Sequence, residues 1–167
     1  MKKLLLLDAD VVIDLHSLDL FEKIGKAYDV YVTREVFKEA AYFKKSGSRI
    51  PINIADKATV IKDVDLESLK EVHKEAKEAR LGIDPGESTS IAYINQTEEE
   101  MIFCSCDKAA IRLISYMGLE QKSISLEKTL RDIGYHEKNL YPRHYGKTFK
   151  ICIKEGKTLR IQFKKFV

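Results

Sequence analysis

Short apolar runs alternate with amphipathic segments along most of the chain. Four consecutive leucines within residues 3–7 indicate a strand buried on both faces, as is typical of a parallel sheet. The other segments predicted from the same patterns are strands at residues 29–32, 59–64, 101–105 and 121–126, and helices at residues 17–28, 33–45, 66–81, 84–94, 107–117 and 127–134. This alternation predicts an α/β fold with three α/β/α layers, in which helices cover both faces of a mostly parallel sheet.

The pattern changes near residue 140. In residues 147–166, polar and apolar residues alternate on either side of the sequence Glu-Gly-Lys, which is typical of a β-hairpin. We therefore predict a three-layer body at residues 1–140 and a C-terminal β-hairpin at residues 141–167.

Positive charge is concentrated in this last part of the chain. The whole chain has a net charge of +3, but nine lysines and arginines face two glutamates in residues 136–167, so this end carries +7 and residues 1–135 carry −4. A basic end beside an acidic body predicts a surface that binds a polyanion, although a solvated hairpin face would show the same charges. The basic residues expected to contact nucleic acid are Lys147, Lys150, Lys154, Lys157 and Arg160.

Composition sets limits on the class of protein. No apolar run approaches the roughly 18 residues of a membrane span, and the leucine run is shorter than the core of a signal peptide. Because the three cysteines are odd in number and lack nearby zinc-ligand partners, we expect reduced cysteines in a cytoplasmic protein without membrane contact. The four histidines, which we expect at the surface, are His16, His73, His136 and His144.

Acidic side chains follow the predicted strands, at the edge where a parallel sheet binds ligands. Asp8 and Asp10 follow the first strand, and Asp107 follows the strand at residues 101–105. Glu39 and Glu87 share helix faces with apolar residues, which predicts that both are buried. A buried acid costs several kcal/mol unless a partner such as a bound cation neutralises it.

Helix capping is the competing interpretation of each acid taken alone. Asp8 and Asp107 each precede a predicted helix, and Asp84 and Glu87 have the spacing of a capping box. Four caps would have no need for two glutamates on buried faces, so the joint placement favours a shared site.

These segments together resemble the PIN-domain nucleases, the family of the VapC-type ribonuclease toxins. The matching motifs are "LLLLDADVVID", "VYVTREVFKEA" and "IFCSCDKAAIRLI", and "LGIDPGESTSIAYI" resembles a Gly-Glu variant of the family's third acidic motif. The resemblance covers roughly residues 3–127 and implies an acidic, metal-binding and catalytic quartet of Asp8, Glu39, Glu87 and Asp107. The supporting or alternative positions that it implies are Asp10, Asp84 and Ser105, with Asp84 competing with Glu87 as the third acid.

The chain departs from the family pattern at two positions. Asp10 stands where asparagine or serine is common, and Cys106 stands where a second acid often occurs. The basic C-terminal segment lies beyond the resemblance, which therefore implies nothing about it.

The resemblance implies an endoribonuclease that uses Mg²⁺ or Mn²⁺ to hydrolyse RNA phosphodiester bonds. Clustered carboxylates suit these hard ions, with Asp8 and Asp107 as direct ligands and Glu39 and Glu87 ligating or orienting metal-bound water. A homodimer and a small inhibitory antitoxin protein are the further partners that the family implies.

Two other functions remain open at this point. A PIN-like body with a weak metal site would act as an RNA-binding module rather than an enzyme. The leucine–aspartate motif also resembles that of the haloacid-dehalogenase-like phosphatases, in which Asp8 would be the nucleophile, although "CSCDKAA" lacks the second acid that those enzymes need.

Overall fold

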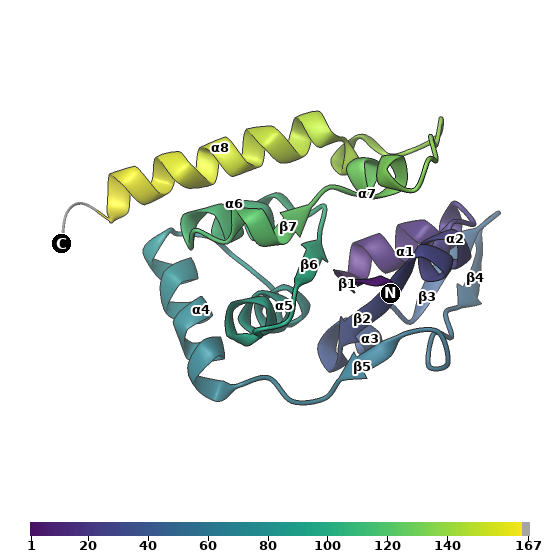
Figure 1. The fold of residues 1–167 in the computed structure, drawn as a ribbon, viewed down its shortest axis with the longest axis horizontal. Helices are drawn as coiled ribbons and strands as arrows, with labels where there is room; N and C mark the ends of the chain where they lie inside the picture. Colours follow the sequence, from purple (N-terminus) through teal and green to yellow (C-terminus); the bar gives the residue numbers. More distant parts are fainter. Residues whose placement is uncertain (165–167) are drawn as a thin grey trace.

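A five-stranded parallel sheet with the order β5-β2-β1-β6-β7 forms the centre of the computed structural model, which describes residues 1–164 (Figure 1). The strands of this sheet are β1 (Lys3–Leu7), β2 (Tyr28–Thr33), β5 (Thr59–Ile61), β6 (Met101–Cys104) and β7 (Ser123–Ile124). The predicted α/β fold with a mostly parallel central sheet is therefore confirmed.

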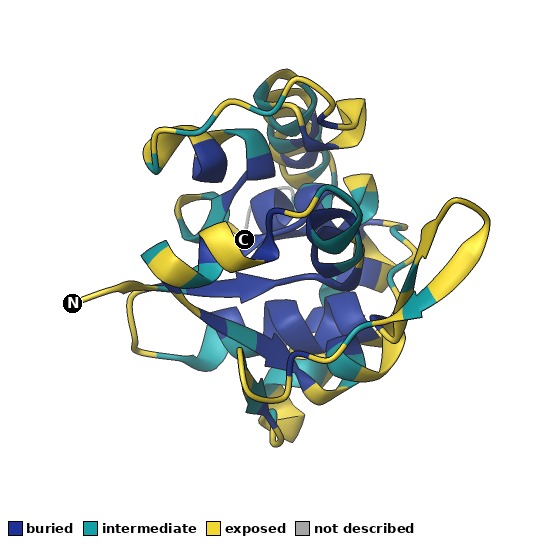
Figure 2. Ribbon diagram, turned by 90° about the vertical axis from the view of Figure 1, so that its right-hand side faces the viewer, coloured by how far each residue is buried: buried dark blue, intermediate teal, exposed yellow. Residues whose placement is uncertain are grey.

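Helices cover both faces of this sheet, which gives the three layers predicted. One face packs against α1 (Ala9–Ser17), α2 (Phe21–Ala27) and α7 (Leu126–Asp132), and the other against α4 (Leu66–Glu78), α5 (Pro85–Gln96) and α6 (Lys108–Tyr116). Leu5 and Leu7 contribute to the first core, whereas Leu6 contributes to the second, because successive side chains of a strand point to opposite faces. Figure 2 shows the buried residues gathered in the sheet and on the helix faces against it.

The order of the strands places a topological switch point beside β1. From β1 the chain builds outward to β2 and β5, and then crosses to β6 and β7 on the other side. In open α/β sheets, ligands bind at such a switch point, beside the carboxyl ends of the strands. Helix N-termini gather at this edge, because a residue at each strand end caps the next helix; these caps are Asp8, Thr33, Asp107 and Ser125.

The helix predicted at residues 33–45 is shorter than expected. Helix α3 (Arg34–Glu39) ends at Glu39 and is followed by an antiparallel hairpin of β3 (Tyr42–Lys45) and β4 (Ser48–Pro51). Ser46 and Gly47 form its two-residue turn with φ values of 51° and 80°, a backbone geometry that suits a tight hairpin.

The predicted C-terminal β-hairpin is wrong, because this segment forms a long helix. Helix α8 (Gly146–Phe163) follows the short 3-10 helix η2 (Pro142–His144) and lies along α6 (Figure 1). Gly156, predicted to sit in the hairpin turn, instead lies in close contact with α6, and a Cβ there would be 2.3 Å from the carbonyl oxygen of Arg112. Leu159 and Phe163 pack against the core, so the basic segment is fastened to the body of the protein.

The helices were also compared with the requirements of a membrane span. No helix within residues 1–164 has the length and apolar character that crossing a bilayer requires.

Candidate functional site

Asp8 and Asp107 lie at the ends of the adjacent strands β1 and β6 and are joined through Ser105. The hydroxyl of Ser105 donates a hydrogen bond to Asp8 Oδ2 at 2.8 Å and accepts one from the backbone N–H of Asp107 at 3.1 Å. The main chain of Asp8 also donates to the carbonyl of Cys104 at 3.1 Å, which fixes its position next to β6. The structure thus brings these two acids and Ser105 together at the switch point.

Both acids also cap helices, as the competing interpretation predicted. Asp8 Oδ1 accepts a hydrogen bond from the N–H of Ala9 at 2.9 Å, and Asp107 Oδ1 accepts one from the N–H of Ala110 at 2.9 Å. Within residues 1–164, Asp107 Oδ2 takes part in no hydrogen bond or ion pair, so capping leaves this oxygen free for a ligand. Capping and ligand binding are therefore compatible roles of one carboxylate.

Glu39 reaches the same edge from the end of α3 and contacts the first turn of α5. Its Oε1 accepts a hydrogen bond from the N–H of Gly86 at 3.1 Å, where the helix N-terminus favours negative charge. A Cβ at position 86 would lie 2.7 Å from Glu39 Oε2, so the absence of a side chain at Gly86 permits this approach. The expectation that Glu39 is buried was wrong: it is exposed, because α3 ends there and Phe43 belongs to β3 instead.

Asp84 and Glu87 form the capping box that their spacing suggested. The Asp84 carboxylate accepts from the N–H of Glu87 at 2.8 Å, and Glu87 Oε2 accepts from the N–H of Asp84 at 2.9 Å. Glu87 is buried, as predicted, whereas Asp84 is exposed. Both acids remain next to the other carboxylates of this edge, so the identity of the third acid stays open.

Electrostatic repulsion connects the six carboxylates, which we call the acidic edge: Asp8, Asp10, Glu39, Asp84, Glu87 and Asp107. Burial raises the pKa of Asp8 to about 7, and the charges of Asp84 and Asp10 raise it further against the hydrogen bonds from Ser105 and Ala9. A pair of buried like charges is costly unless a proton or a cation neutralises one of them.

The two glutamates of the acidic edge respond in the same way. Burial raises the pKa of Glu87 to about 8, and the charges of Asp107, Asp8 and Asp84 add to this effect. Desolvation also raises the pKa of Glu39, followed by repulsion from Asp84. The charges that act on Glu87 thus come from Asp8, Asp84 and Asp107, and those that act on Glu39 come from Asp84 and Asp10 within the acidic edge.

The carboxylates of the acidic edge do not form a compact group of metal ligands. Among residues 1–164, they do not bring three ligand atoms within 4.8 Å of one another. The donors are all oxygens, which is the set that Mg²⁺ and Mn²⁺ prefer. The residues whose position at adjacent strand ends suits direct contact with such an ion are Asp8 and Asp107.

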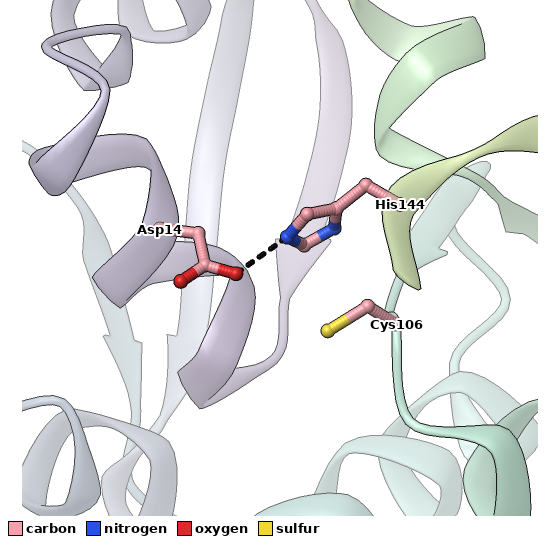
Figure 3. A group of neighbouring side chains, drawn as sticks. All are labelled: Asp14, Cys106 and His144. Carbon is pink, nitrogen blue, oxygen red and sulfur yellow. Dashed lines mark hydrogen bonds and ion pairs between the residues drawn. The ribbon is translucent and has the colours of Figure 1, made fainter. Parts of the chain in front are cut away.

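A second cluster lies beside the acidic edge and was not predicted. Asp14 from α1, Cys106 from the loop after β6 and His144 from η2 are all buried, with ligand atoms within 4.8 Å of one another. The imidazole of His144 and the thiol of Cys106 both point toward Asp14 (Figure 3), and the distance from His144 Nε2 to Asp14 Oδ2 is 2.6 Å. The expectation that His144 lies at the surface was therefore wrong.

The chemistry of this second cluster does not point to Mg²⁺ or Mn²⁺. Its mixture of sulfur, nitrogen and oxygen is softer than the donor set of those ions. Burial also raises the pKa of the Cys106 thiol well above its ordinary value, which keeps it protonated. Arg143 already balances the charge of Asp14, donating to its Oδ2 from Nε at 2.9 Å and from Nη2 at 2.6 Å. The cluster therefore serves to fasten residues 143–144 to α1.

The basic residues of the C-terminal segment lie on one side of α8. All five are exposed, and their spacing of three or four residues places them along one broad stripe of the helix; this basic stripe consists of Lys147, Lys150, Lys154, Lys157 and Arg160. Gly146 at the start of α8 donates to Glu127 Oε1 at 3.0 Å, close to the cap of α7 at the end of β7. The stripe therefore begins at the same sheet edge as the acids, and nucleic-acid binding by it stays a prediction.

The other three histidines were expected at the surface, and the cysteines were expected to be reduced. His73 and His136 are exposed, as expected, whereas His16 is half-buried and stacks on Phe21 with 4.6 Å between ring centroids. All cysteines are free and buried, in agreement with the reduced state expected; they are Cys104, Cys106 and Cys152.

A comparison of the chain with protein-family models, curated proteins and solved structures finds no match. The resemblance to PIN-domain nucleases therefore depends on the sequence motifs alone, and it stays a prediction.

Proposed function

We propose that this protein is an endoribonuclease that uses Mg²⁺ or Mn²⁺ to hydrolyse RNA phosphodiester bonds at the acidic edge. The observation that supports this most strongly is the meeting of carboxylates from β1, α3, α5 and β6 at the topological switch point. Interactions with helix N-termini explain Asp8, Asp107 and Glu39 one at a time, but they do not require that acids from separate segments of the chain gather at one edge of the sheet.

The residues of the acidic edge divide into binding and positioning roles. Asp8 and Asp107 offer carboxylate oxygens at adjacent strand ends, and Ser105 holds the Asp8 carboxylate in place. Glu39 and Glu87 would ligate a divalent ion or orient water around it. When bound, such an ion would lower the pKa of a water molecule that could then attack the phosphodiester. The basic stripe on α8 supplies charge that binds the phosphates of the substrate.

The choice of RNA as the substrate depends on the resemblance in the sequence motifs. The same resemblance predicts a homodimer and a small antitoxin protein as an inhibitory partner, and the reduced cysteines favour a cytoplasmic location. A basic antitoxin segment would suit the acidic edge, since it would neutralise the same carboxylates as the metal.

The proposal is tested by incubating the purified protein with structured RNAs and Mn²⁺. Asp107→Asn should lower the cleavage rate by about 100-fold or more, as is typical when a group that acts on the transition state is lost. Asparagine caps helices about as well as aspartate, so the variant should keep its fold, as thermal unfolding would show. Asp132→Asn, which alters an exposed aspartate paired with Lys128, is the matched control and should cleave like the wild type.

Either of two results would contradict the proposal. Cleavage that continues in an excess of EDTA would exclude a divalent ion, and cleavage that Asp107→Asn leaves unchanged would exclude the acidic edge as its site.

One observation favours the alternative of an RNA-binding module with little activity. Arg143 Nη1 lies 3.6 Å from Asp10 Oδ2, so part of the charge of the acidic edge is neutralised without any metal. RNA binding that survives Asp8→Asn, together with no cleavage by the wild type in Mn²⁺, would support this alternative.

A further inference from the structure

A cleft of about 380 Å³ opens next to the acidic edge. It lies between α1, the β3–β4 hairpin and Tyr141, and the carboxylate-bearing Glu39 forms part of its wall. Two tyrosines, Tyr42 and Tyr141, also line the cleft, and each keeps 38% of its surface exposed. Aromatic rings that line a cleft and remain exposed provide flat faces on which a ligand can stack.

We propose that this cleft binds an unpaired base of a single-stranded RNA segment, with Tyr42 and Tyr141 as the stacking surfaces. This inference rests on the proposed function and deepens it, because it names the form of RNA that the acidic edge receives. Proteins that bind single-stranded nucleic acid combine aromatic side chains for the bases with positive charge for the backbone. Both are present around this cleft.

Positive charge surrounds the two tyrosines. The guanidinium of Arg49 lies 4.5 Å from the ring centroid of Tyr42, and that of Arg143 lies 6.0 Å from the centroid of Tyr141. Lys44 lines the cleft from β3 and is exposed. Because Arg143 is already paired with Asp14 and Asp10, the cations left to meet a phosphate backbone beside the cleft are Lys44 and Arg49, both on the hairpin side.

This charge is needed because the acidic edge itself repels RNA. Without a bound metal ion, the carboxylates repel an approaching phosphate. The substrate must therefore be held by contacts outside the acidic edge. The hairpin supplies such contacts at one side of the cleft. Since Glu39 belongs both to the cleft wall and to the acidic edge, a base seated in the cleft would place a neighbouring phosphate at the acids.

Stacking in the cleft requires a base that is not paired. In an A-form duplex the bases are stacked on each other, and their faces are not available to protein side chains. The cleft therefore predicts a preference for single strands, loops or ends over continuous duplex.

The test measures binding without cleavage, in EDTA and at low salt. The probe is a short single-stranded RNA that contains 2-aminopurine, whose fluorescence falls when the base stacks on an aromatic ring. Tyr42→Ala and Tyr141→Ala should each weaken binding by about 5- to 150-fold and reduce the quenching, because the loss of one base–aromatic stack has this effect. Tyr42→Phe keeps the ring and should bind like the wild type.

Two further variants keep the test clear. Tyr145→Ala removes a tyrosine that is 37% exposed but does not line the cleft, so it should bind like the wild type. Tyr42→Leu keeps apolar bulk in the hairpin without an aromatic face; it should bind as weakly as Tyr42→Ala, which separates stacking from damage to the fold.

The outcomes distinguish this inference from the nuclease proposal. Equal binding of duplex and single strand, no binding by the wild type, or equal loss in Tyr145→Ala would overturn the cleft as a base site. Cleavage in Mn²⁺ that does not depend on Tyr42 would overturn the cleft alone. Binding that depends on Tyr42 in a protein that cleaves no RNA would support the cleft and overturn the nuclease.

Discussion

At the scale of single residues, Asp8 shows how one carboxylate can serve both the fold and a site. Its Oδ1 caps α1 and its Oδ2 accepts from Ser105, so both oxygens are held in place before any ligand arrives. Burial at this position stabilises the protonated form of the acid. Without a bound cation, hydrogen bonds hold the Asp8 carboxylate in place, but its burial makes the charged form unfavourable.

The cost of burying a charged Asp8 predicts how the stability of the fold depends on pH. The pKa of Asp8 is raised from 3.8 to about 7 in the folded protein, so the folded chain holds a proton that the unfolded chain releases. The contribution of this group is therefore fully present below about pH 4 and is lost as the pH rises toward about 7, at about 1.4 kcal/mol for each pKa unit. In EDTA, the melting temperature of the wild type should fall relative to that of Asp8→Asn across this range.

Thermal unfolding at several pH values measures this difference. Adding Mn²⁺ near pH 8 should raise the melting temperature of the wild type more than that of Asp8→Asn, because only the wild type has a buried carboxylate at position 8 for the ion to neutralise. A difference between the two proteins that stays constant from about pH 4 to about pH 8 would show that the burial of Asp8 carries no such cost.

Gly86 predicts a separation between stability and activity. Gly86→Ala places a Cβ 2.7 Å from Glu39 Oε2, and this flexible carboxylate must move away. Gly86 lies in the first turn of α5, where alanine gains less over glycine than in a helix interior, so the melting temperature should stay close to that of the wild type. RNA cleavage in Mn²⁺ should nevertheless fall, since Glu39 leaves the acidic edge; full activity in this variant would exclude the position of Glu39 as a requirement.

Sequence reasoning located some of these residues and missed others for a physical reason. Asp8 and Asp107 could be found because Asp8 directly follows an apolar strand and Asp107 lies three residues after another, and strand ends meet at one edge of a parallel sheet. The pair of Asp14 and His144 joins residues 130 positions apart in the chain, and no local pattern marks such a contact. The only signal was an acid set among apolar residues of the first helix.

At the scale of elements, the C-terminal segment shows how one sequence can match both the two-residue period of a strand and the 3.6-residue period of a helix. Residues 147–163 alternate polar and apolar positions, but Phe149, Cys152, Gly156 and Leu159 also recur at the three- and four-residue spacing of a helix. The neighbouring helix α6 decides between them, because it offers a long surface on which the helical face of α8 is buried. The sequence alone could not show that surface.

Gly156 provides a test of this packing. Gly156→Ala places a Cβ 2.3 Å from the backbone oxygen of Arg112 and 2.7 Å from Cβ of Ser115, and a backbone atom cannot move aside cheaply. Overpacking of this kind costs about 1–3 kcal/mol, more than alanine gains in helix propensity. The matched control is Gly25→Ala in α2, where a Cβ meets no atom within 4 Å.

Chemical denaturation should therefore give opposite results for the two alanine variants. Gly25→Ala should be as stable as the wild type or up to about 1 kcal/mol more stable, whereas Gly156→Ala should unfold at a lower denaturant concentration. Equal stability of both variants would mean that α8 does not pack closely on α6.

At the scale of the whole molecule, charge is divided between an acidic sheet edge and a basic helix. The acids would bind the metal and the basic stripe would bind the phosphates, so the two functions lie on different elements that meet where α8 begins. This division could be predicted from the sequence even though the hairpin was wrong, because the count of charges in the segment does not depend on its secondary structure.

The division predicts how RNA binding depends on salt. Each phosphate contact on a single strand contributes about 0.7 to the slope of log affinity against log salt concentration. Lys147 and Lys150 lie in the first turns of α8, the end of the basic stripe nearest the acidic edge. If both contact phosphates, the double variant Lys147→Gln, Lys150→Gln should reduce this slope by about 1.4. It should also weaken the binding of all RNA sequences to a similar extent.

The control must remove the same charge from a place that the RNA does not reach. Lys23 and Lys26 are exposed on α2, which leads directly into the start of β2 and so lies toward the opposite edge of the sheet. The double variant Lys23→Gln, Lys26→Gln lowers the net charge equally but should leave the slope unchanged within error. Equal slopes for the two double variants would mean that RNA senses only the net charge of the protein, and the basic stripe of α8 would then have no part in positioning the strand.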